Sequence, residues 1–238
     1  MLTISIVSHG HGALVRDLLR DLDTVVGVPF KVVLTHNIPE PDQFDPAGLR
    51  YRLQIIRNER PRGFGANHNA AFGATAGNHF CVINPDVRLT ADPFPALLAG
   101  LGDAATAVAA PAIVGQAGKM ESTARRFPTP ASILRKALVG PPALEYAIGP
   151  DPLRVDWVSG VFMMLRRETY LRLGGFDERY FLYYEDVDLC ARAGALGLSV
   201  CLVPAVSAIH AARRDSHRNP RYAAWHLRSM LRFFLTRY

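Results

Sequence analysis

The sequence predicts a single α/β domain built on a largely parallel sheet, and three observations support this fold class. Short apolar runs alternate along the chain with segments of helical spacing, which is the order expected of parallel strands joined by helices. Polar residues follow the ends of several of these runs, at the edge where such sheets bind ligands. The chain has 238 residues, 49% of them hydrophobic, which is enough for one sizeable core.

The first half of the chain contains four predicted strands and two helices. The spacing of its leucines predicts a helix over residues 13–26, and an Ala-rich helix follows a predicted Gly-rich loop at 63–69. We expect polar side chains at the strand ends to share one edge of the sheet, because parallel strands end on the same side. These side chains are Ser8, His9, Asn37, Asn58 and Asp86. The strands are predicted over residues 2–8, 30–34, 53–57 and 80–83.

The second half is less regular. Residues 95–110 read as a helix and the start of a strand, and residues 115–152 as a Gly- and Pro-rich excursion with one helix near 133–138. An apolar segment follows at 155–165. A last strand is predicted over 200–209, ending at His210.

The most informative segment is 180–190, where three carboxylates follow an aromatic run. A helix is predicted to begin near Glu185, because four apolar or small residues then recur at helical spacing. Asp186 would lie at the helix N-terminus, where the dipole favours an ionised carboxylate. Such a group could accept a proton from an incoming hydroxyl, or it could simply cap the helix. The predicted buried stripe is Val187, Cys190, Ala191 and Gly194.

The net charge of +6 is concentrated in the tail. Residues 211–238 hold seven arginines and one aspartate, which leaves 20 basic and 20 acidic residues in the rest of the chain. A basic tail attracts phosphates, but no nucleic-acid motif is present, so we expect no nucleic-acid partner. The tail's apolar stripe fits a helix packed on the body or one lying on an anionic membrane surface. This stripe is Leu227, Met230, Leu231, Phe234, Leu235 and Tyr238.

The cysteines and the apolar runs bear on the compartment. Cys81, Cys190 and Cys201 are scattered in apolar surroundings without zinc spacing, as is typical of core thiols in a reducing compartment. No apolar run is long enough to span a bilayer, and the first residues read as a strand and not as a signal peptide. We therefore expect a cytoplasmic protein.

Taken together, the motifs resemble those of the inverting family 2 glycosyltransferases, and most closely their bacterial rhamnosyltransferase-like branch. Each motif is short, but their number, order and spacing make the resemblance specific over nearly the whole chain. The motifs are ISIVSH at 4–9, Asn58 with GFGANHN at 63–69, NPDVRL at 84–89, ESTARRFP at 121–128, DWVSG at 156–160, GGFDE at 174–178 and YEDVDL at 184–189.

The resemblance implies the GT-A fold, a Rossmann-like nucleotide-binding half with a mixed central sheet. We expect a glycosyltransferase domain over 1–212, with a donor half over 1–115 and an acceptor half over 116–212, followed by a basic amphipathic helical tail over 213–238. It further implies transfer of a sugar, rhamnose among the candidates, from a UDP- or dTDP-linked donor to a saccharide or lipid-linked saccharide. The setting would be bacterial surface polysaccharide synthesis in the cytoplasm, and the amphipathic tail adds the option of a peripheral location on the inner face of the cytoplasmic membrane.

The resemblance also implies where the donor binds. Asp86 matches the family's metal-binding acid, and Asn84 stands where its Asp-X-Asp-like turn has the first acid. His210 could complete a site for Mn²⁺ or Mg²⁺, or it could be structural. The second strand ends without the acid that this family often has before Asn37, which leaves the base unassigned. The nucleotide-binding candidates are Ser8, His9, Asn37, Phe64, Gly65, Asn67, Asn84 and Asp86.

The remaining roles concern the acceptor and the leaving group. Asp186 is the candidate catalytic base. Glu185 and Trp157 would shape the acceptor pocket, although Trp157 could equally pack in the core. Arg213 and Arg214 could bind the diphosphate, or remain solvated charges.

Two other functions stay open at this stage. A nucleotidyltransferase-like enzyme would share the strand-end edge but would need no base near Asp186. A non-catalytic sugar-binding protein with a degenerate site would explain Asn84 and Thr35.

Overall fold

A continuous mixed sheet forms the centre of the computed structural model, which describes residues 1–140, 142–211 and 220–237. Within these residues the strand order is β3-β2-β1-β4-β10-β6-β11-β5, with β8 paired to β11. The first four strands are parallel, whereas β10 runs antiparallel between β4 and β6. The predicted α/β class with a mixed sheet is confirmed. The strands of this sheet are β1 (Leu2–Ser8), β2 (Phe30–His36), β3 (Arg52–Arg57), β4 (His79–Ile83), β5 (Val87–Arg88), β6 (Thr106–Gly115), β8 (Leu153–Val155), β10 (Phe162–Arg166) and β11 (Ser199–His210).

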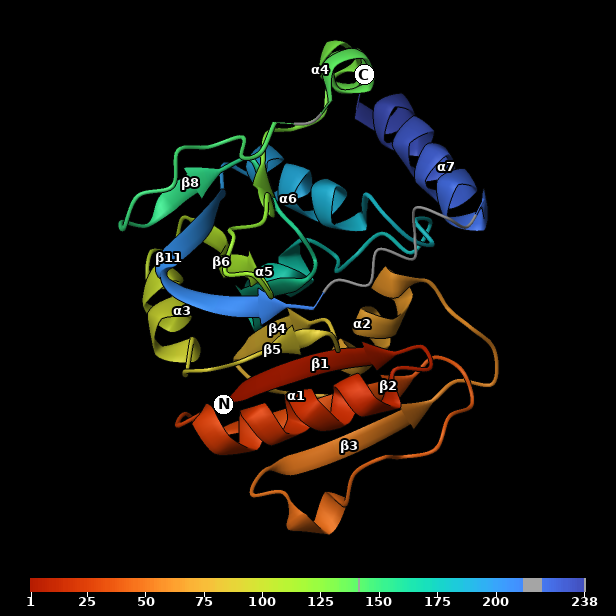
Figure 1. Cartoon of the computed structure of the whole chain (residues 1–238), viewed down its shortest axis with the longest axis vertical. Coiled ribbons are helices and arrows are strands. Elements are labelled where there is room, and N and C mark those ends of the chain that lie inside the picture. Colours follow the sequence, from red (N-terminus) through yellow and green to blue (C-terminus); the bar gives the residue numbers. More distant parts are fainter. Residues whose placement is uncertain (141, 212–219, 238) are drawn as a thin grey trace.

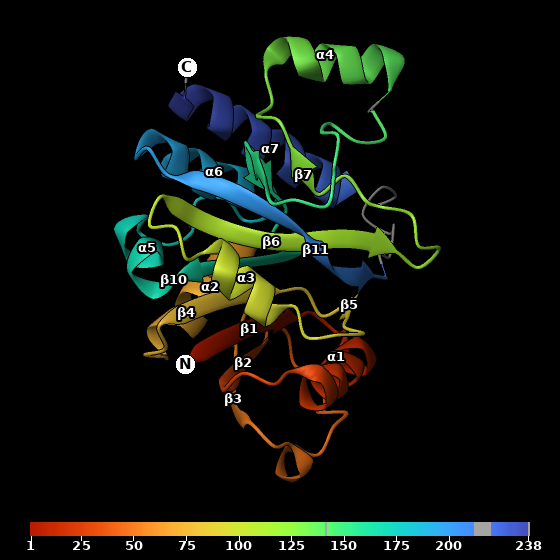
Figure 2. The ribbon, with the colours of Figure 1, turned by 90° about the vertical axis from the view of Figure 1, so that its left-hand side faces the viewer.

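Helices cover both faces of this sheet (Figures 1 and 2). One apolar cluster joins the sheet to α1 and α3, and a second joins it to α2, α5 and α6. The side chains of β10 alternate between the clusters, because successive residues of a strand point to opposite faces. The helices are α1 (Gly12–Val25), α2 (Phe64–Gly73), α3 (Phe94–Gly100), α4 (Pro130–Val139), α5 (Arg167–Arg172), α6 (Glu185–Ala195) and α7 (Pro220–Arg237), with a 3₁₀ turn at Pro46–Gly48.

A small second sheet lies apart from the first. It pairs β7 (Ala124–Arg125) with β9 (Trp157–Val158) in antiparallel orientation. This pairing brings two motifs that are far apart in the sequence to one place, beside the start of α6.

Two details differ from the sequence-based expectation. The Gly-rich segment is not a loop, because α2 already begins at Phe64. In α6 the buried stripe contains Ala193 and not Gly194, which is exposed. The helix itself begins at Glu185, as predicted.

Helix α7 packs on the body through a narrower stripe than expected. Phe233 and Ser229 are buried, and Phe233 joins a third apolar cluster with Tyr180 and Tyr184. Leu227, Leu231 and Leu235 of the predicted stripe remain exposed. Tyr238, its last member, lies outside the described residues. None of the helices in the described ranges is both long and apolar enough to cross a bilayer.

Candidate active site

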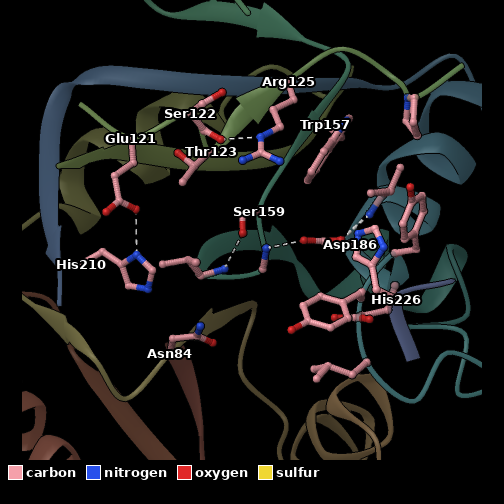
Figure 3. A pocket seen from close by; sticks show the side chains of 18 of the residues that line it. Asn84, Glu121, Ser122, Thr123, Arg125, Trp157, Ser159, Asp186, His210 and His226 are labelled. Atoms are coloured by element: carbon pink, nitrogen blue, oxygen red, sulfur yellow. Dashed lines mark hydrogen bonds and ion pairs between the residues drawn. The ribbon is translucent and has the colours of Figure 1, made fainter. Parts of the chain in front are cut away.

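A cleft of about 1130 Å³ opens between the end of β4, the small β7–β9 sheet and the start of α6. Its wall comes from segments spread over the whole chain, which is how the fold unites motifs that the sequence separates. Figure 3 shows Asp186 and His210 at opposite sides of this view, with Ser159 between them. The predicted site residues that line the cleft are Phe64, Asn84, Asp86, Trp157, Glu185, Asp186 and His210.

One side of the cleft carries an imidazole between two carboxylates. His210 Nε2 lies 3.3 Å from Asp86 Oδ2, and its Nδ1 lies 2.8 Å from Glu121 Oε2. Asp86 and His210 meet because β5, which follows the turn that holds Asp86, pairs with β11. Glu121 joins them because its segment folds back on the end of β6, which also pairs with β11. Burial lowers the pKa of His210, but the hydrogen bonds and charges of the two carboxylates outweigh it and raise the pKa to about 9. The imidazole is therefore cationic at neutral pH.

Asp86 retains capacity for a further cationic partner. Its Oδ1 is buried and has no hydrogen-bond partner in the described structure. Burial opposes ionisation, yet the hydrogen bond with His210 holds the pKa of Asp86 below its usual value. The described ranges contain no cluster of three His, Cys, Asp or Glu side chains with metal-site geometry. Asp86 and His210 could hold a divalent ion once the imidazole releases its Nε2 proton, and the ion would take its other ligands from water and phosphate oxygens.

The opposite side of the cleft is formed by the first turn of α6. Tyr183 and Tyr184 precede it with φ of 70° and 68°, a left-handed conformation that costs non-glycine residues roughly 1–3 kcal/mol each. This turn directs Asp186 into the cleft. The backbone N–H of Gly160 donates to Asp186 Oδ2 at 3.0 Å, and that of Val187 donates to Oδ1 at 2.8 Å. Both carboxylate oxygens are thereby oriented, and each keeps a lone pair for a ligand.

The two acids of this turn differ in their surroundings. Glu185 is 4% exposed, and its Oε2 has no hydrogen-bond partner in the described structure. Burial and the neighbouring Asp186 raise the pKa of Glu185 well above its ordinary range. Burial also raises the pKa of Asp186, but the two backbone N–H donors counteract it. The surroundings thus disfavour the ionised form of Glu185 more strongly, and Asp186, with its two N–H donors, is the acid that can exchange a proton with a ligand.

The β7–β9 sheet supplies an aromatic wall and a cation. Trp157 is half-buried, and its indole N–H donates to the carbonyl of Arg126 at 2.9 Å. The Arg125 guanidinium carbon lies 5.6 Å from the centre of the Trp157 rings, and Arg125 Nε donates to the carbonyl of Ser122. No ion pair of Arg125 is found within the described ranges. Trp157 is therefore a wall of the cleft, with a guanidinium beside it.

Sequence reasoning assigned no role to three of these cleft residues, Glu121, Arg125 and Gly160. All three fall inside motifs noted above, ESTARRFP and DWVSG, so the signal was present. It could not be read as chemistry, because the partner of each residue is distant in sequence and depends on how the strands pair.

The predicted residues at the ends of β1 and β2 lie outside the cleft lining. Ser8 is buried and accepts a hydrogen bond from the His11 N–H at 3.1 Å, and His9 is exposed beside Asn37. Asn37 is 6% exposed and accepts from the Arg62 N–H at 2.7 Å. These residues form the edge next to the Asp86 side, because β1 neighbours β4 in the sheet.

Gly65 and Asn67 pack against the body of the protein, and their predicted contact with the nucleotide stays a prediction. Asn67 is 1% exposed, and its amide bonds to Asn58 and to the carbonyls of Arg62 and Gly63. A Cβ on Gly65 would lie 2.6 Å from the Cβ of Phe176. The hydrogen bonds of Asn67 and the close approach of Phe176 to Gly65 fix α2 against the body. Arg213 and Arg214, predicted to bind the diphosphate, lie outside the described residues.

Comparison with known families gives a match over most of the chain. The family described as "Glycosyltransferase like family 2" matches residues 12–232. The rhamnosyltransferase WbbL of Escherichia coli is 28% identical, with 98% of this chain and 92% of that protein aligned. N-acetylglucosaminyl-diphospho-decaprenol L-rhamnosyltransferase of Mycobacterium tuberculosis is also 28% identical, over 92% of this chain and 79% of that protein.

The fold is shared with a solved mannosyltransferase, PcManGT of Pyrobaculum calidifontis, determined with GDP-Man and Mn²⁺. The TM-score is 0.62 at 16% identity, and the alignment covers 90% of this chain and 57% of the mannosyltransferase. At this identity the likeness concerns the fold alone. The resemblance and the GT-A fold expected from the motifs are both confirmed.

Proposed function

Because the chain belongs to glycosyltransferase family 2, we propose that it is an inverting transferase moving a sugar from a nucleoside-diphosphate donor to an acceptor hydroxyl. One observation carries this proposal: Asp186 lies on one side of the cleft and the Asp86–His210 pair on the other. A base on one side and an anchor for the leaving group on the other are what a single displacement requires.

Asp186 acts in this proposal as the general base. Its carboxylate is held by two backbone N–H groups, and its raised pKa brings its basicity closer to that of the hydroxyl it serves. The acceptor ring would lie against Trp157, whose aromatic face suits the apolar C–H surface of a sugar. Asp186 would remove the proton of the acceptor hydroxyl as the hydroxyl oxygen attacks the anomeric carbon. Because this is a single displacement, the configuration of that carbon is inverted once.

The leaving group departs toward Asp86 and His210 in this scheme. These residues would hold a divalent cation, Mn²⁺ or Mg²⁺, and a bound cation would neutralise the charge that grows on the diphosphate. The unpartnered Oδ1 of Asp86 supports the assignment. Asn84, on the same turn, would contact the donor through its amide. Arg213 and Arg214, which follow His210 in the sequence, would bind the diphosphate.

We assign donor binding to residues 1–115 and acceptor binding to residues 116–212. The edge formed by Ser8, His9 and Asn37 is our candidate for the nucleoside, since ligands of such sheets bind beyond the carboxyl ends of the strands. Phe64 and Glu185 line the cleft between the two parts.

The substrates are proposed from the relatives. The mycobacterial relative is named for a diphospho-decaprenol acceptor and for L-rhamnose, and the relative in E. coli is also a rhamnosyltransferase. We therefore propose a rhamnosyl donor, UDP- or dTDP-linked, and a lipid-linked saccharide of a bacterial surface polysaccharide as acceptor. The three free, buried cysteines fit action on the cytoplasmic side of the membrane.

Thermal unfolding with UDP, dTDP and GDP, each with and without Mn²⁺, tests the donor site. A nucleotide at about 100 times its Kd stabilises by roughly 2.7 kcal/mol, which raises the Tm of a chain of this size by roughly 5–10 °C. A Mn²⁺-dependent rise with one nucleotide is expected. Turnover then separates the alternatives: a sugar-binding protein would bind the nucleotide without consuming its sugar, and a nucleotidyltransferase would release pyrophosphate instead of a nucleoside diphosphate.

A further inference from the structure

Two helices at one end of the molecule expose an unusual amount of apolar surface. Six of the eleven large apolar side chains that are exposed in the described residues lie on α4 and α7. Figures 1 and 2 both show these helices at the same end of the long axis, opposite β3. The six are Leu134, Leu138 and Val139 on α4, and Leu227, Leu231 and Leu235 on α7. We call them the α4–α7 surface.

The charges of the same helices are of one sign. Neither α4 nor α7 contains an aspartate or a glutamate. Arg135 is exposed beside Leu134, and Arg228 and Arg232 line a shallow groove on α7 together with its leucines. The surface is therefore apolar and cationic at once.

The α4–α7 surface lies beside the cleft. Ile133 and Lys136 of α4 and Met230 of α7 line the cleft wall, so both helices border it. On its inner side α7 is anchored by buried Phe233 and by Ser229, whose hydroxyl donates to the carbonyl of Leu182 at 2.9 Å. Because the inner side is already packed, the outer leucines have no place in the core of this chain.

We propose that the α4–α7 surface docks on an anionic phospholipid bilayer and holds the cleft next to the headgroups. An apolar stripe edged by arginines is the pattern of a helix lying in a membrane interface, where the apolar side chains enter the acyl boundary and the cations meet lipid phosphates. The charge argues against a second copy as the occupant, because two such cationic surfaces would repel each other. This inference rests on the proposed function, since docking would bring a lipid-linked acceptor to the cleft.

Vesicle co-sedimentation of the full chain tests this proposal. We expect binding to vesicles of phosphatidylcholine with about one-third phosphatidylglycerol, and much weaker binding to phosphatidylcholine alone. Leu231→Glu should lower the partition coefficient by about tenfold or more, because it removes apolar contact and adds a repelled charge. Leu138→Glu should do the same, because Leu138 belongs to the α4 part of the surface. Leu171→Glu is the matched control, since Leu171 is 57% exposed against 52% for Leu231 but lies on α5.

Three results would overturn the proposal. One is wild-type protein that binds neither vesicle type, and another is Leu231→Glu binding as well as the Leu171→Glu control. The third is a concentration-dependent dimer that Leu231→Glu abolishes without any vesicle binding, which would make the surface a contact between copies. Nucleotide- and Mn²⁺-dependent stabilisation, measured on the same variants, should stay unchanged, so that failure of docking is distinguished from failure of the donor site.

Discussion

The backbone N–H of Gly160 donates a hydrogen bond of 3.0 Å to Oδ2 of Asp186, although 26 residues separate the two in the chain. This bond ties the segment between β9 and β10 to the first turn of α6. A Cβ on Gly160 would lie 3.0 Å from Phe64 and 3.8 Å from the Cβ of Asp186. The orientation of Asp186 therefore depends on a close approach that three separate motifs create together.

Substitution of Gly65 by alanine should destabilise the protein. The added methyl group would lie 2.6 Å from the Cβ of Phe176, and overpacking of this kind costs roughly 1–3 kcal/mol. Gly73→Ala is the matched control on the same helix, because no atom lies within 4 Å of its added Cβ. The Tm should fall for Gly65→Ala and hold or rise for Gly73→Ala. Equal Tm values with a loss of nucleotide binding only in Gly65→Ala would instead favour a direct ligand contact.

Substitution of Asp86 by asparagine should remove the metal-dependent part of nucleotide binding. The change keeps the shape of the side chain but removes the charge that a divalent ion requires. We expect the Tm rise produced by a nucleoside diphosphate with Mn²⁺ to shrink to the rise seen with the nucleotide and EDTA. Asp103→Asn, on a half-exposed carboxylate outside the cleft, is the control. An undiminished Mn²⁺ effect in Asp86→Asn would show that the cation binds elsewhere.

Substitution of Glu185 by glutamine should leave the cleft working and change the pH dependence of stability. The folded-state pKa of Glu185 is raised well above 4.5, so the folded chain holds a proton that the unfolded chain releases. Its contribution to stability is therefore full below pH 4.5 and declines as the pH rises toward the folded-state pKa. Glutamine cannot ionise, so Glu185→Gln should gain Tm relative to wild type as the pH rises. Tm curves that stay parallel between pH 4 and 8 would mean that Glu185 is ionised in the fold.

Much of the fold was predictable because it follows from local patterns. Short apolar runs became β1, β2 and β4, and helical spacing located α1 and the start of α6 within a residue or two. The motifs also indicated Asp86 and Asp186. What the sequence could not show depends on contacts across the fold. Gly65 lies in a segment that reads as a loop but packs against Phe176, and the role of Glu121 becomes visible only when β11 brings His210 beside it.

The tail shows the same limit. Its apolar spacing correctly predicts a helix, but spacing alone does not decide which apolar residues face the body. Phe233 packs into the aromatic cluster around Tyr184, so this side of the helix faces the body and the leucines on the other side stay exposed.

The most direct test of the account compares Asp186→Asn with wild type for both donor binding and sugar transfer. Loss of a general base lowers turnover by roughly 10²–10⁴-fold, whereas donor binding, measured as nucleotide- and Mn²⁺-dependent Tm, should be retained. Asp188→Asn is the matched control. It changes the same group two positions further along α6, where the carboxylate pairs with Arg192 outside the cleft, and should cost stability but not chemistry. Transfer at the wild-type rate by Asp186→Asn would contradict the assignment of Asp186 as the base, and with it the proposed mechanism.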